Sequence, residues 1–155
     1  MPAKQTKKAK PAASVQPYTV NLTDTAAAAY ARFYERAQKA DARGDNDSAH
    51  LTTLRQLDDA LEKIIPSDPF NKKFALVGSL RPIFRLHQGR LRICWVGSSE
   101  RRFVEVIFIS ETLRKEGDKN DPYEVLSRKV RNGEFDDVFR ALNLQSPLRK
   151  LTDTR

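Results

Sequence analysis

Four basic residues occur at short intervals in one stretch of the sequence: Arg85, His87, Arg90 and Arg92. Residues 88–89 between them are Gln-Gly, which suits a two-residue turn of an antiparallel hairpin. Such a turn pairs Arg85 with Arg92 and the two inner residues with each other, so all four side chains share one face. Arginines directly opposite each other destabilise a sheet by about 0.2–1 kcal/mol when no counter-charge is present. We therefore expect an anion on this face, and guanidinium groups suit phosphate because they bind it bidentately.

A second interpretation of the same pattern is an ordinary surface charge network. Glu105, on a neighbouring predicted strand, or another acidic side chain could neutralise the cluster. A slip of one residue in the hairpin would also scatter the four side chains over both faces. The apolar residues that alternate with the basic ones must face the helices of the domain: Phe84, Leu86, Leu91 and Ile93. We favour the anion site over the network.

His87 adds an imidazole to this face. Neighbouring guanidinium charges disfavour a protonated imidazole, so His87 could act as a base. A histidine at the end of a turn is also commonly a solvated side chain without a chemical role. Both interpretations stay open, whereas His50 has no such companions and is expected to be structural.

The composition favours a polyanionic partner. The 155 residues carry 28 Lys and Arg against 20 Asp and Glu, a formal charge of +8, which alone does not separate RNA from DNA, an acidic protein or a membrane surface. One cysteine and two histidines cannot build a disulfide framework or a Cys/His metal cluster, so we expect no metal and no cofactor. Cys94 lies in an apolar run and is expected to be a small buried hydrophobe. No apolar segment long enough for secretion or membrane insertion follows the basic N-terminus, so we expect a cytoplasmic protein.

Periodicity places the basic hairpin within a mixed domain. Apolar residues recur every three or four positions in two successive stretches, the second starting at Asn46 or Asp47 and ending at Pro66. Residues 67–80 lack periodicity and are expected to form a long connection. We expect strands over residues 18–22, 82–87, 90–96 and 102–110, and helices over 24–43, 46–65, 123–131 and 134–143. The order β-α-α-β-β-β plus a C-terminal helix predicts an α+β fold, in which two helices pack on a mostly antiparallel sheet and the most apolar strand is central.

The composition changes at both ends of this domain. Residues 1–16 combine Lys, Ala, Pro and Gln with almost no large apolar side chains, which predicts a disordered basic tail. Residues 144–155 are polar and basic and predict a flexible C-terminal tail. The folded domain is therefore expected to occupy residues 17–143.

The segment after the last predicted strand carries a more specific pattern. Residues 112–125 are TLRKEGDKNDPYEV, and they resemble the YhaV toxin family, in which a TLR, G-x-K, D-x-Y pattern follows the last core strand. Upstream, Gly89-Arg90-Leu91-Arg92-Ile93 is similar to the family's Gly-Arg-aromatic-Arg-apolar strand. The resemblance extends over about residues 17–143 and places the chain in the RelE/ParE toxin superfamily.

The resemblance implies a RelE-like fold and the toxin of a type II toxin–antitoxin system. Such a toxin is an endoribonuclease, an mRNA interferase that cuts messenger RNA, often on the ribosome, and is held inactive by an antitoxin protein. The superfamily relies on Lys, Arg and a late Tyr and requires no metal. Carried over by position, the catalytic residues are Arg85, Arg92, Arg114 and Tyr123. The sequence departs from the family at Leu91, where an aromatic is usual, and at Arg85, where the family has a lysine, so a lysine base at that position is in doubt.

The implied reaction is cleavage through the 2′-hydroxyl of the RNA itself. It requires loss of the 2′ proton, stabilisation of charge on phosphorus and protonation of the 5′ oxygen. Arg92 and Arg114 could clamp the phosphate, each supplying about 2–4 kcal/mol of transition-state stabilisation. Tyr123 could stack on a base or orient the hydroxyl, or it could be an aromatic packed on the core at the start of a helix.

Four further residues are candidates for contacts with RNA: His87, Arg90, Lys115 and Lys119. Each of the two lysines could equally be a solvated surface side chain. Two other functions also stay open, a non-catalytic module that binds ribosomal or other RNA and a ParE-like poison of DNA gyrase. The segment from residue 112 to residue 123 argues against the gyrase poison. An antitoxin would either cover the basic face or displace the last helix.

Overall fold

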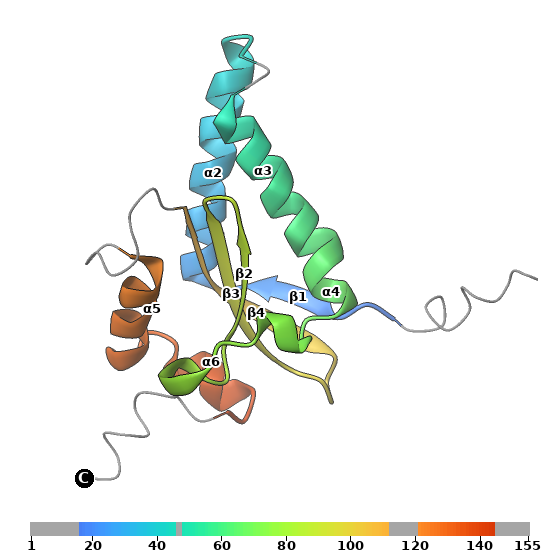
Figure 1. The fold of residues 1–155 in the computed structure, drawn as a ribbon, viewed down its shortest axis with the longest axis vertical. Coiled ribbons are helices and arrows are strands. Elements are labelled where there is room, and N and C mark those ends of the chain that lie inside the picture. Colours follow the sequence, from blue (N-terminus) through green and yellow to red (C-terminus); the bar gives the residue numbers. More distant parts are fainter. Residues whose placement is uncertain (1–15, 46–47, 112–120, 145–155) are drawn as a thin grey trace, which may run out of the picture.

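A four-stranded sheet forms the centre of the structure, a computed structural model that describes residues 16–45, 48–111 and 121–144. Its strands, in the order β1-β4-β3-β2, are β1 (Thr19–Leu22), β4 (Phe103–Glu111), β3 (Leu91–Ser98) and β2 (Phe84–Gln88). β1 runs parallel to β4, and the other two pairs are antiparallel. The predicted α+β fold with a mostly antiparallel sheet is confirmed (Figure 1).

Two helices, α2 (Asp24–Ala42) and α3 (Ala49–Asp59), form a hairpin that covers one face of the sheet (Figure 1). Thr23 fixes the start of α2 because its Oγ1 accepts the N–H of Ala26 at 3.2 Å. The helices meet the sheet through small and large apolar side chains that alternate at helical spacing. The buried set on this side includes Ala26, Ala29, Phe33, Leu57, Ala60, Leu91, Ile93, Trp95, Val104, Val106 and Ile109.

The start of α3 differs from the prediction. Ser48 is the N-cap, and its hydroxyl accepts the N–H of His50 at 3.0 Å. The predicted starts, Asn46 and Asp47, lie outside the described residues, and the helix begins after them at Ala49. Serine is as good an N-cap as Asn or Asp, so three successive residues of similar propensity left the boundary ambiguous.

The end of this second helix also differs from the prediction. After α3 the chain continues through a π-helical turn, Ala60–Ile64, into α4 (Ile65–Ser67). Pro66 lies within α4, and the helix ends at Ser67, two residues after the predicted last residue 65. The predicted long connection follows and contains two 3-10 turns, Lys72–Phe74 and Gly78–Leu80.

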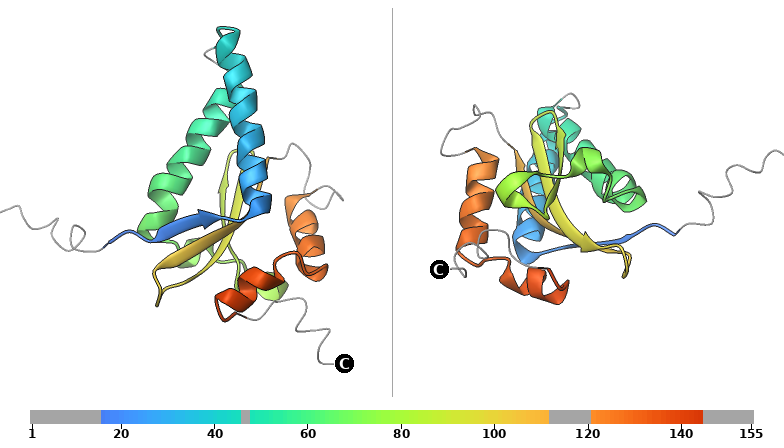
Figure 2. Two further views of the ribbon diagram at one scale, coloured as in Figure 1. Left: turned by 180° about the vertical axis from the view of Figure 1, so that it is seen from behind. Right: turned by 60° about the horizontal axis from the view of Figure 1, so that its bottom comes forward.

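The other face of the sheet is covered by α5 (Pro122–Arg131) and α6 (Asp136–Ala141), the second of which is shorter than predicted. In the right-hand view of Figure 2 the sheet lies between α5 and α3. The buried side chains on this face include Ile83, Cys94, Val96, Ile107, Phe108, Leu126, Val130, Phe135 and Phe139. Two apolar layers therefore hold the sheet from both sides.

β4 supplies side chains to both layers and contains a β-bulge. Cys94 pairs with Phe108, whereas the next residue, Trp95, pairs with Val106, so Ile107 is the extra residue. Ile107 and Phe108 both join the α5 side, and Val106 joins the α2–α3 side. β4 is thus central and covered on both faces, as predicted from its apolar composition.

Both hairpin turns lie later in the sequence than predicted. Residues 89–90 join β2 to β3, and residues 99–102 join β3 to β4, in place of the predicted 88–89 and 97–100. Gln88-Gly89 and Gly89-Arg90 share one glycine, so residue type alone does not decide which of the two pairs forms the turn. Gly89 has a φ of +60° and takes the first central position, the place where a type II′ turn needs glycine.

The predicted tails, residues 1–16 and 144–155, lie almost entirely outside the described residues, so their character and the domain limits stay predictions. No helix in the described part of the chain is long and apolar enough to cross a membrane.

Gly97 on β3 generates a testable prediction because it has no room for a side chain. A Cβ atom there would lie 2.5 Å from the backbone oxygen of Phe103 and 2.9 Å from Cζ of Phe70. We expect Gly97→Ala to lower the free energy of unfolding by about 1–3 kcal/mol, measured by urea denaturation. Ser99→Ala, in an exposed turn, is the control and should change it by less than about 0.5 kcal/mol. An unchanged value for Gly97→Ala would contradict the packing around this strand.

Candidate anion-binding site

The β2–β3 hairpin pairs Arg85 with Cys94 and His87 with Arg92. The predicted pairs, Arg85 with Arg92 and His87 with Arg90, are therefore wrong, and no two of these arginines lie directly opposite each other. The register differs from the prediction by two residues. Because side-chain direction repeats every two residues, the face is preserved. Arg85, His87 and Arg92 share one face of the sheet, on the α5 side, and we call this the arginine face.

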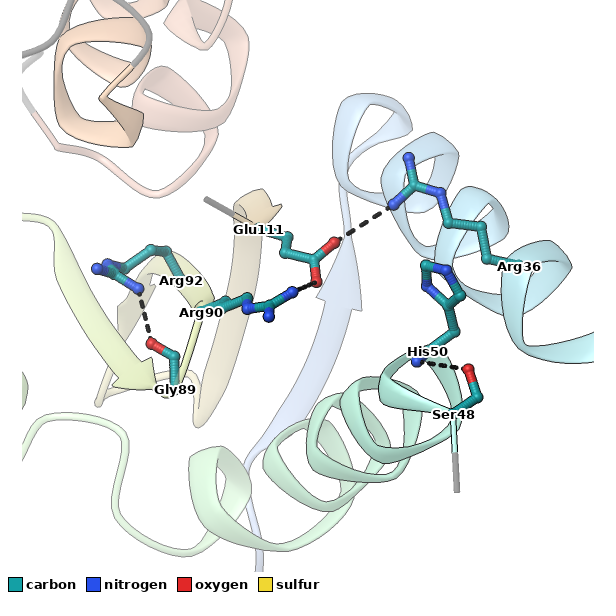
Figure 3. A network of polar contacts seen from close by, with 7 residues as sticks. All are labelled: Arg36, Ser48, His50, Gly89, Arg90, Arg92 and Glu111. Carbon is teal, nitrogen blue, oxygen red and sulfur yellow. Dashed lines mark hydrogen bonds and ion pairs between the residues drawn. The ribbon is translucent and has the colours of Figure 1, made fainter. Parts of the chain in front are cut away.

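Arg90 lies in the turn and does not belong to the arginine face. Its Nη1 is 3.9 Å from Oε2 of Glu111, while Nη1 of Arg36 on α2 is 3.5 Å from Oε1 of the same carboxylate. Figure 3 shows Arg90 and Arg92 pointing in opposite directions. Glu111 pairs with Leu91, which is buried on the α2–α3 side. The predicted place of Arg90 in the cluster is wrong. Arg90 lies in the turn, where side chains do not alternate between the two faces as they do in a strand.

His87 and Arg92 meet at the carbonyl oxygen of Gly89. Arg92 Nη1 donates to this oxygen at 3.2 Å (Figure 3). His87 Nε2 lies 3.0 Å from the same oxygen. In the tautomer that carries hydrogen on Nε2, His87 also donates, and its Nδ1 is left as an acceptor. The side chain of His87 is exposed, so this acceptor is open to solvent.

Three buried polar groups of this region make no hydrogen bond with any described residue: Nε of Arg85, Nε of Arg92 and the hydroxyl of Tyr123. Tyr123 comes from the first turn of α5, whose apolar side packs on the same sheet face. Unbonded buried donors are rare in folded proteins, because each one costs about 1–3 kcal/mol of lost hydration. All three groups can donate a hydrogen bond, and none of them has an acceptor among the described residues.

The guanidinium charges of Arg85 and Arg92 act on the pKa values of two neighbouring groups, Cys94 and Tyr123. Burial raises the pKa of the Cys94 thiol to about 12, against an opposing effect of Arg85 and Arg92. Burial also raises the pKa of the Tyr123 hydroxyl, and the same two arginines lower it. Arg92 therefore acts on the phenol electrostatically, although the pair lacks the geometry of a hydrogen bond. The phenol stays protonated at neutral pH and can donate.

No described carboxylate forms a salt bridge with Arg85 or Arg92. Glu105, the residue that could have neutralised the cluster, instead accepts a hydrogen bond from Asn21 Nδ2 at 2.8 Å. Burial raises the pKa of Glu105, and this hydrogen bond opposes the rise. Glu105 therefore does not neutralise the cluster, whereas another acidic side chain, Glu111, pairs with one predicted member of it, Arg90.

Ser110 was missed by the sequence analysis and belongs to the same region. It pairs with Arg92, and directly paired residues share a face of a sheet. Phe108, two residues earlier, faces the α5 side, so alternation along β4 already predicts the same side for Ser110. Its hydroxyl adds one more donor and acceptor beside Arg92.

Three predicted site residues, Arg114, Lys115 and Lys119, lie outside the described residues, and their roles stay predictions. Within the described ranges, no group of three or more His, Cys, Asp or Glu side chains is placed to hold a metal ion. The donors that the described residues offer are cationic or neutral. They suit an oxyanion.

These side chains define a basic α+β domain with a cationic face on one side of its sheet. The sequence model of the YhaV toxin family, described as a toxin with endonuclease activity of a toxin–antitoxin system, matches residues 19–146. The chain belongs to the YhaV toxin family, and it is therefore the toxin of such a system and an enzyme, an endonuclease. The family resemblance found in the sequence is confirmed.

Curated proteins gave no significant match. Among solved structures, the chain is similar to the crystal structure of the toxin–antitoxin complex RelBE2 from Mycobacterium tuberculosis, with 17% identity and a TM-score of 0.48, over 65% of this chain and 98% of that chain. The family assignment rests on the family model and not on this likeness.

The burial of Cys94 generates a prediction about its reactivity. Because the thiol keeps its proton up to a pKa of about 12, a disulfide reagent at about pH 8 should label it at least about a hundredfold more slowly in the folded protein than in concentrated urea. An unfolded thiol loses its proton near 9.0, so the free energy of unfolding should also fall as pH rises from there towards 12. Cys94→Ser should lack this component of the fall. Equal labelling rates in the two states would contradict the buried position.

Proposed function

We propose that the protein is an endoribonuclease that cuts messenger RNA, a metal-independent mRNA interferase whose reaction takes place on the arginine face. The observation that carries the proposal is the set of three unbonded buried polar groups, on Arg85, Arg92 and Tyr123. A phosphodiester offers acceptor oxygens and no donors, so it can satisfy all three at once. Cutting messenger RNA stops translation and growth, which is the effect of a toxin.

Arg85 and Arg92 hold the scissile phosphate and stabilise the charge that develops on phosphorus. No described carboxylate neutralises them, and the fully buried Cys94 gives the site an apolar floor. Electrostatic interactions are stronger in such a low-dielectric setting than in water. Each preorganised donor contributes about 2.7–4 kcal/mol to the transition state.

His87 and Tyr123 serve the two proton transfers. The 2′ oxygen of the RNA attacks phosphorus, its proton passes to Nδ1 of His87, and the bond from phosphorus to the 5′ oxygen breaks. Tyr123, kept protonated by its raised pKa, donates a proton to the departing 5′ oxygen. The products are a 2′,3′-cyclic phosphate and a 5′-hydroxyl. Because RNA supplies its own nucleophile, this scheme assigns no task to a metal ion or an activated water.

The family assignment extends the proposal beyond the described residues. Arg114 adds a third cation at the phosphate, and Lys115 and Lys119 contact flanking phosphates, as the family pattern implies. The substrate is messenger RNA in the cytoplasm, free or on the ribosome, the toxin domain occupies residues 17–143, and the cognate antitoxin keeps the enzyme inactive. The endonuclease activity of the family favours cleavage over RNA binding alone and over gyrase poisoning.

Arg92→Ala should lower the rate of RNA cleavage by about 10²–10³-fold, because one preorganised donor to the developing charge is lost. The measurement is the yield of RNA fragments with 2′,3′-cyclic phosphate ends, from purified protein with and without ribosomes. Arg43→Ala is the matched control, since it removes the same charge from an exposed position outside the arginine face, and it should keep full activity. Undiminished cleavage by both Arg92→Ala and Arg85→Ala would refute the site.

Cleavage of ribosome-free RNA should be unchanged within about twofold when a chelator of divalent metal ions is added, because the proposed charge stabilisation comes from arginines. The comparison is made on the same RNA with and without chelator. Loss of cleavage that Mg²⁺ restores would show that a metal ion takes part and would overturn the metal-independent scheme.

A further inference from the structure

Glu111, the last residue of β4, forms an ion-pair network to which the proposed mechanism assigns no task. Its side chain is only 17% exposed, and its two oxygens lie 3.5 Å from Nη1 of Arg36 and 3.9 Å from Nη1 of Arg90. Figure 3 shows the carboxylate between these two guanidinium groups, one on α2 and the other at the β2–β3 turn. The network therefore joins the helix hairpin to the turn that precedes Arg92.

The helix end of this network is fixed by the apolar core. The guanidinium carbon of Arg36 lies 5.7 Å from the centre of the Phe33 ring, and Phe33 is buried in the α2–α3 layer. Glu111 is held by its strand, since it pairs with Leu91, which is buried in the same layer. Within the described ranges, the side chain of Arg90 forms no ion pair or hydrogen bond except the one with Glu111. Arg90 therefore depends on this carboxylate for its position.

The β2–β3 turn has few other supports. Gly89 and Arg90 are both exposed, and a Cβ atom on Gly89 would have only Oε1 of Gln56 within 4 Å, at 3.9 Å. A glycine has more backbone freedom than any other residue, so it fixes the turn weakly. In the part of the chain that the structure describes, no other salt bridge involves this turn. The ion pair with Glu111 is thus its tether to the domain.

The position of Arg90 sets the direction of the Gly89 carbonyl. This carbonyl and the N–H of Arg90 belong to one planar peptide group, so they turn together. The same carbonyl oxygen accepts a hydrogen bond from Arg92 Nη1 at 3.2 Å and lies 3.0 Å from Nε2 of His87. A continuous link therefore runs from Glu111 through the turn to two side chains of the arginine face.

We propose that Glu111 is a positioning residue of the RNA-cleaving site, acting through Arg90 and the Gly89 carbonyl on His87 and Arg92. The carbonyl accepts the hydrogen on Nε2 of His87 and so leaves Nδ1 free to take the 2′ proton. It also holds one Nη1 of Arg92, which keeps the guanidinium plane in place beside the phosphate. The inference rests on the proposed function, and it adds to the site a carboxylate that does not touch the RNA.

Glu111→Gln tests this role because it removes the carboxylate charge and keeps the size of the side chain. We expect kcat for RNA cleavage by the purified full-length protein to fall about ten- to a hundredfold, since the base and one phosphate donor are misplaced. KM should not rise, because the substitution frees the guanidinium groups of Arg36 and Arg90 for the RNA. Glu35→Gln is the matched control, since it removes the same charge from an exposed ion pair with Lys39, and it should leave both constants within about twofold.

A double-mutant cycle tests the path from Glu111 to the turn. Arg90→Gln should lower kcat by about the same factor as Glu111→Gln, and the double variant should fall no further, because both changes break one link. Two factors that multiply in the double variant would overturn the path. An unchanged kcat for Glu111→Gln, or an equal loss in Glu35→Gln, would overturn the proposal.

Nuclear magnetic resonance of the His87 ring gives a readout that needs neither RNA nor catalysis. The nitrogen chemical shifts of Nδ1 and Nε2 report which of the two carries hydrogen in the neutral ring. Their difference should be large in the wild type and smaller in Glu111→Gln, since the tautomers mix when the carbonyl turns away. Arg90→Gln, at an exposed position, should reduce the difference equally and replaces Glu111→Gln if that variant does not fold.

The same measurement separates this proposal from the proposed function. An identical shift difference in the wild type and both variants would overturn the positioning role even if kcat fell. Absence of RNA cleavage by the wild-type protein would count against the proposed function alone, and the His87 shifts would still decide whether Glu111 positions the ring.

Discussion

The side chains of Arg85 and Arg92 are half-buried beside the hydroxyl of Tyr123 and the thiol of Cys94. No described carboxylate neutralises them, and the surrounding fold must accommodate this unpaired charge. Placing Arg85 and Arg92 there costs free energy, because their Nε groups lose water and gain no partner. The two apolar layers on either side of the sheet offset that cost. Trp95, Ile93 and Val106 anchor one layer, and Ile107 and Phe139 the other.

Glu111 divides the arginines of the chain into two groups. Its carboxylate lies at the end of β4 on the α2–α3 side, where it draws in Arg36 and Arg90 (Figure 3). Ser110, one residue earlier, faces the opposite side beside Arg92. Because the side chains of β4 alternate between the two faces, Glu111 neutralises arginines on the α2–α3 side, whereas Arg92, beside Ser110 on the other side, has no such carboxylate. The same division leaves the arginine face on the α5 side of the sheet cationic.

The sequence predicted the elements well because each has a local cause, such as the Thr23 cap of α2 or the apolar run of β4. It also placed Arg85, His87 and Arg92 on one face, although the pairing was wrong by two residues. A register error of two residues keeps every side chain on the same face, so the alternation of side chains along a strand does not reveal it. The choice between turns at residues 88–89 and 89–90 depends on how β3 packs against β4. Arg90 was misplaced for the same reason.

Other parts of the site depend on contacts between distant residues. The link from Glu111 to Arg36 joins residues 75 positions apart, and no local pattern indicates it. The bulge at Ile107 arises from packing on both faces of β4, so alternation alone could not predict it. The meeting of Tyr123 with Arg92 followed only from family resemblance, since a helix-start tyrosine has no periodic relation to a strand arginine.

The most direct test of the central claim is nuclear magnetic resonance of the arginine Nε–H groups during titration with a short RNA whose 2′-hydroxyls are methylated, so that it binds without being cut. The Nε–H signals of Arg85 and Arg92 should shift together and saturate at the same RNA concentration, while that of Arg36, already paired with Glu111, stays in place. Signals of Arg85 and Arg92 that remain unchanged at saturating RNA would contradict the account.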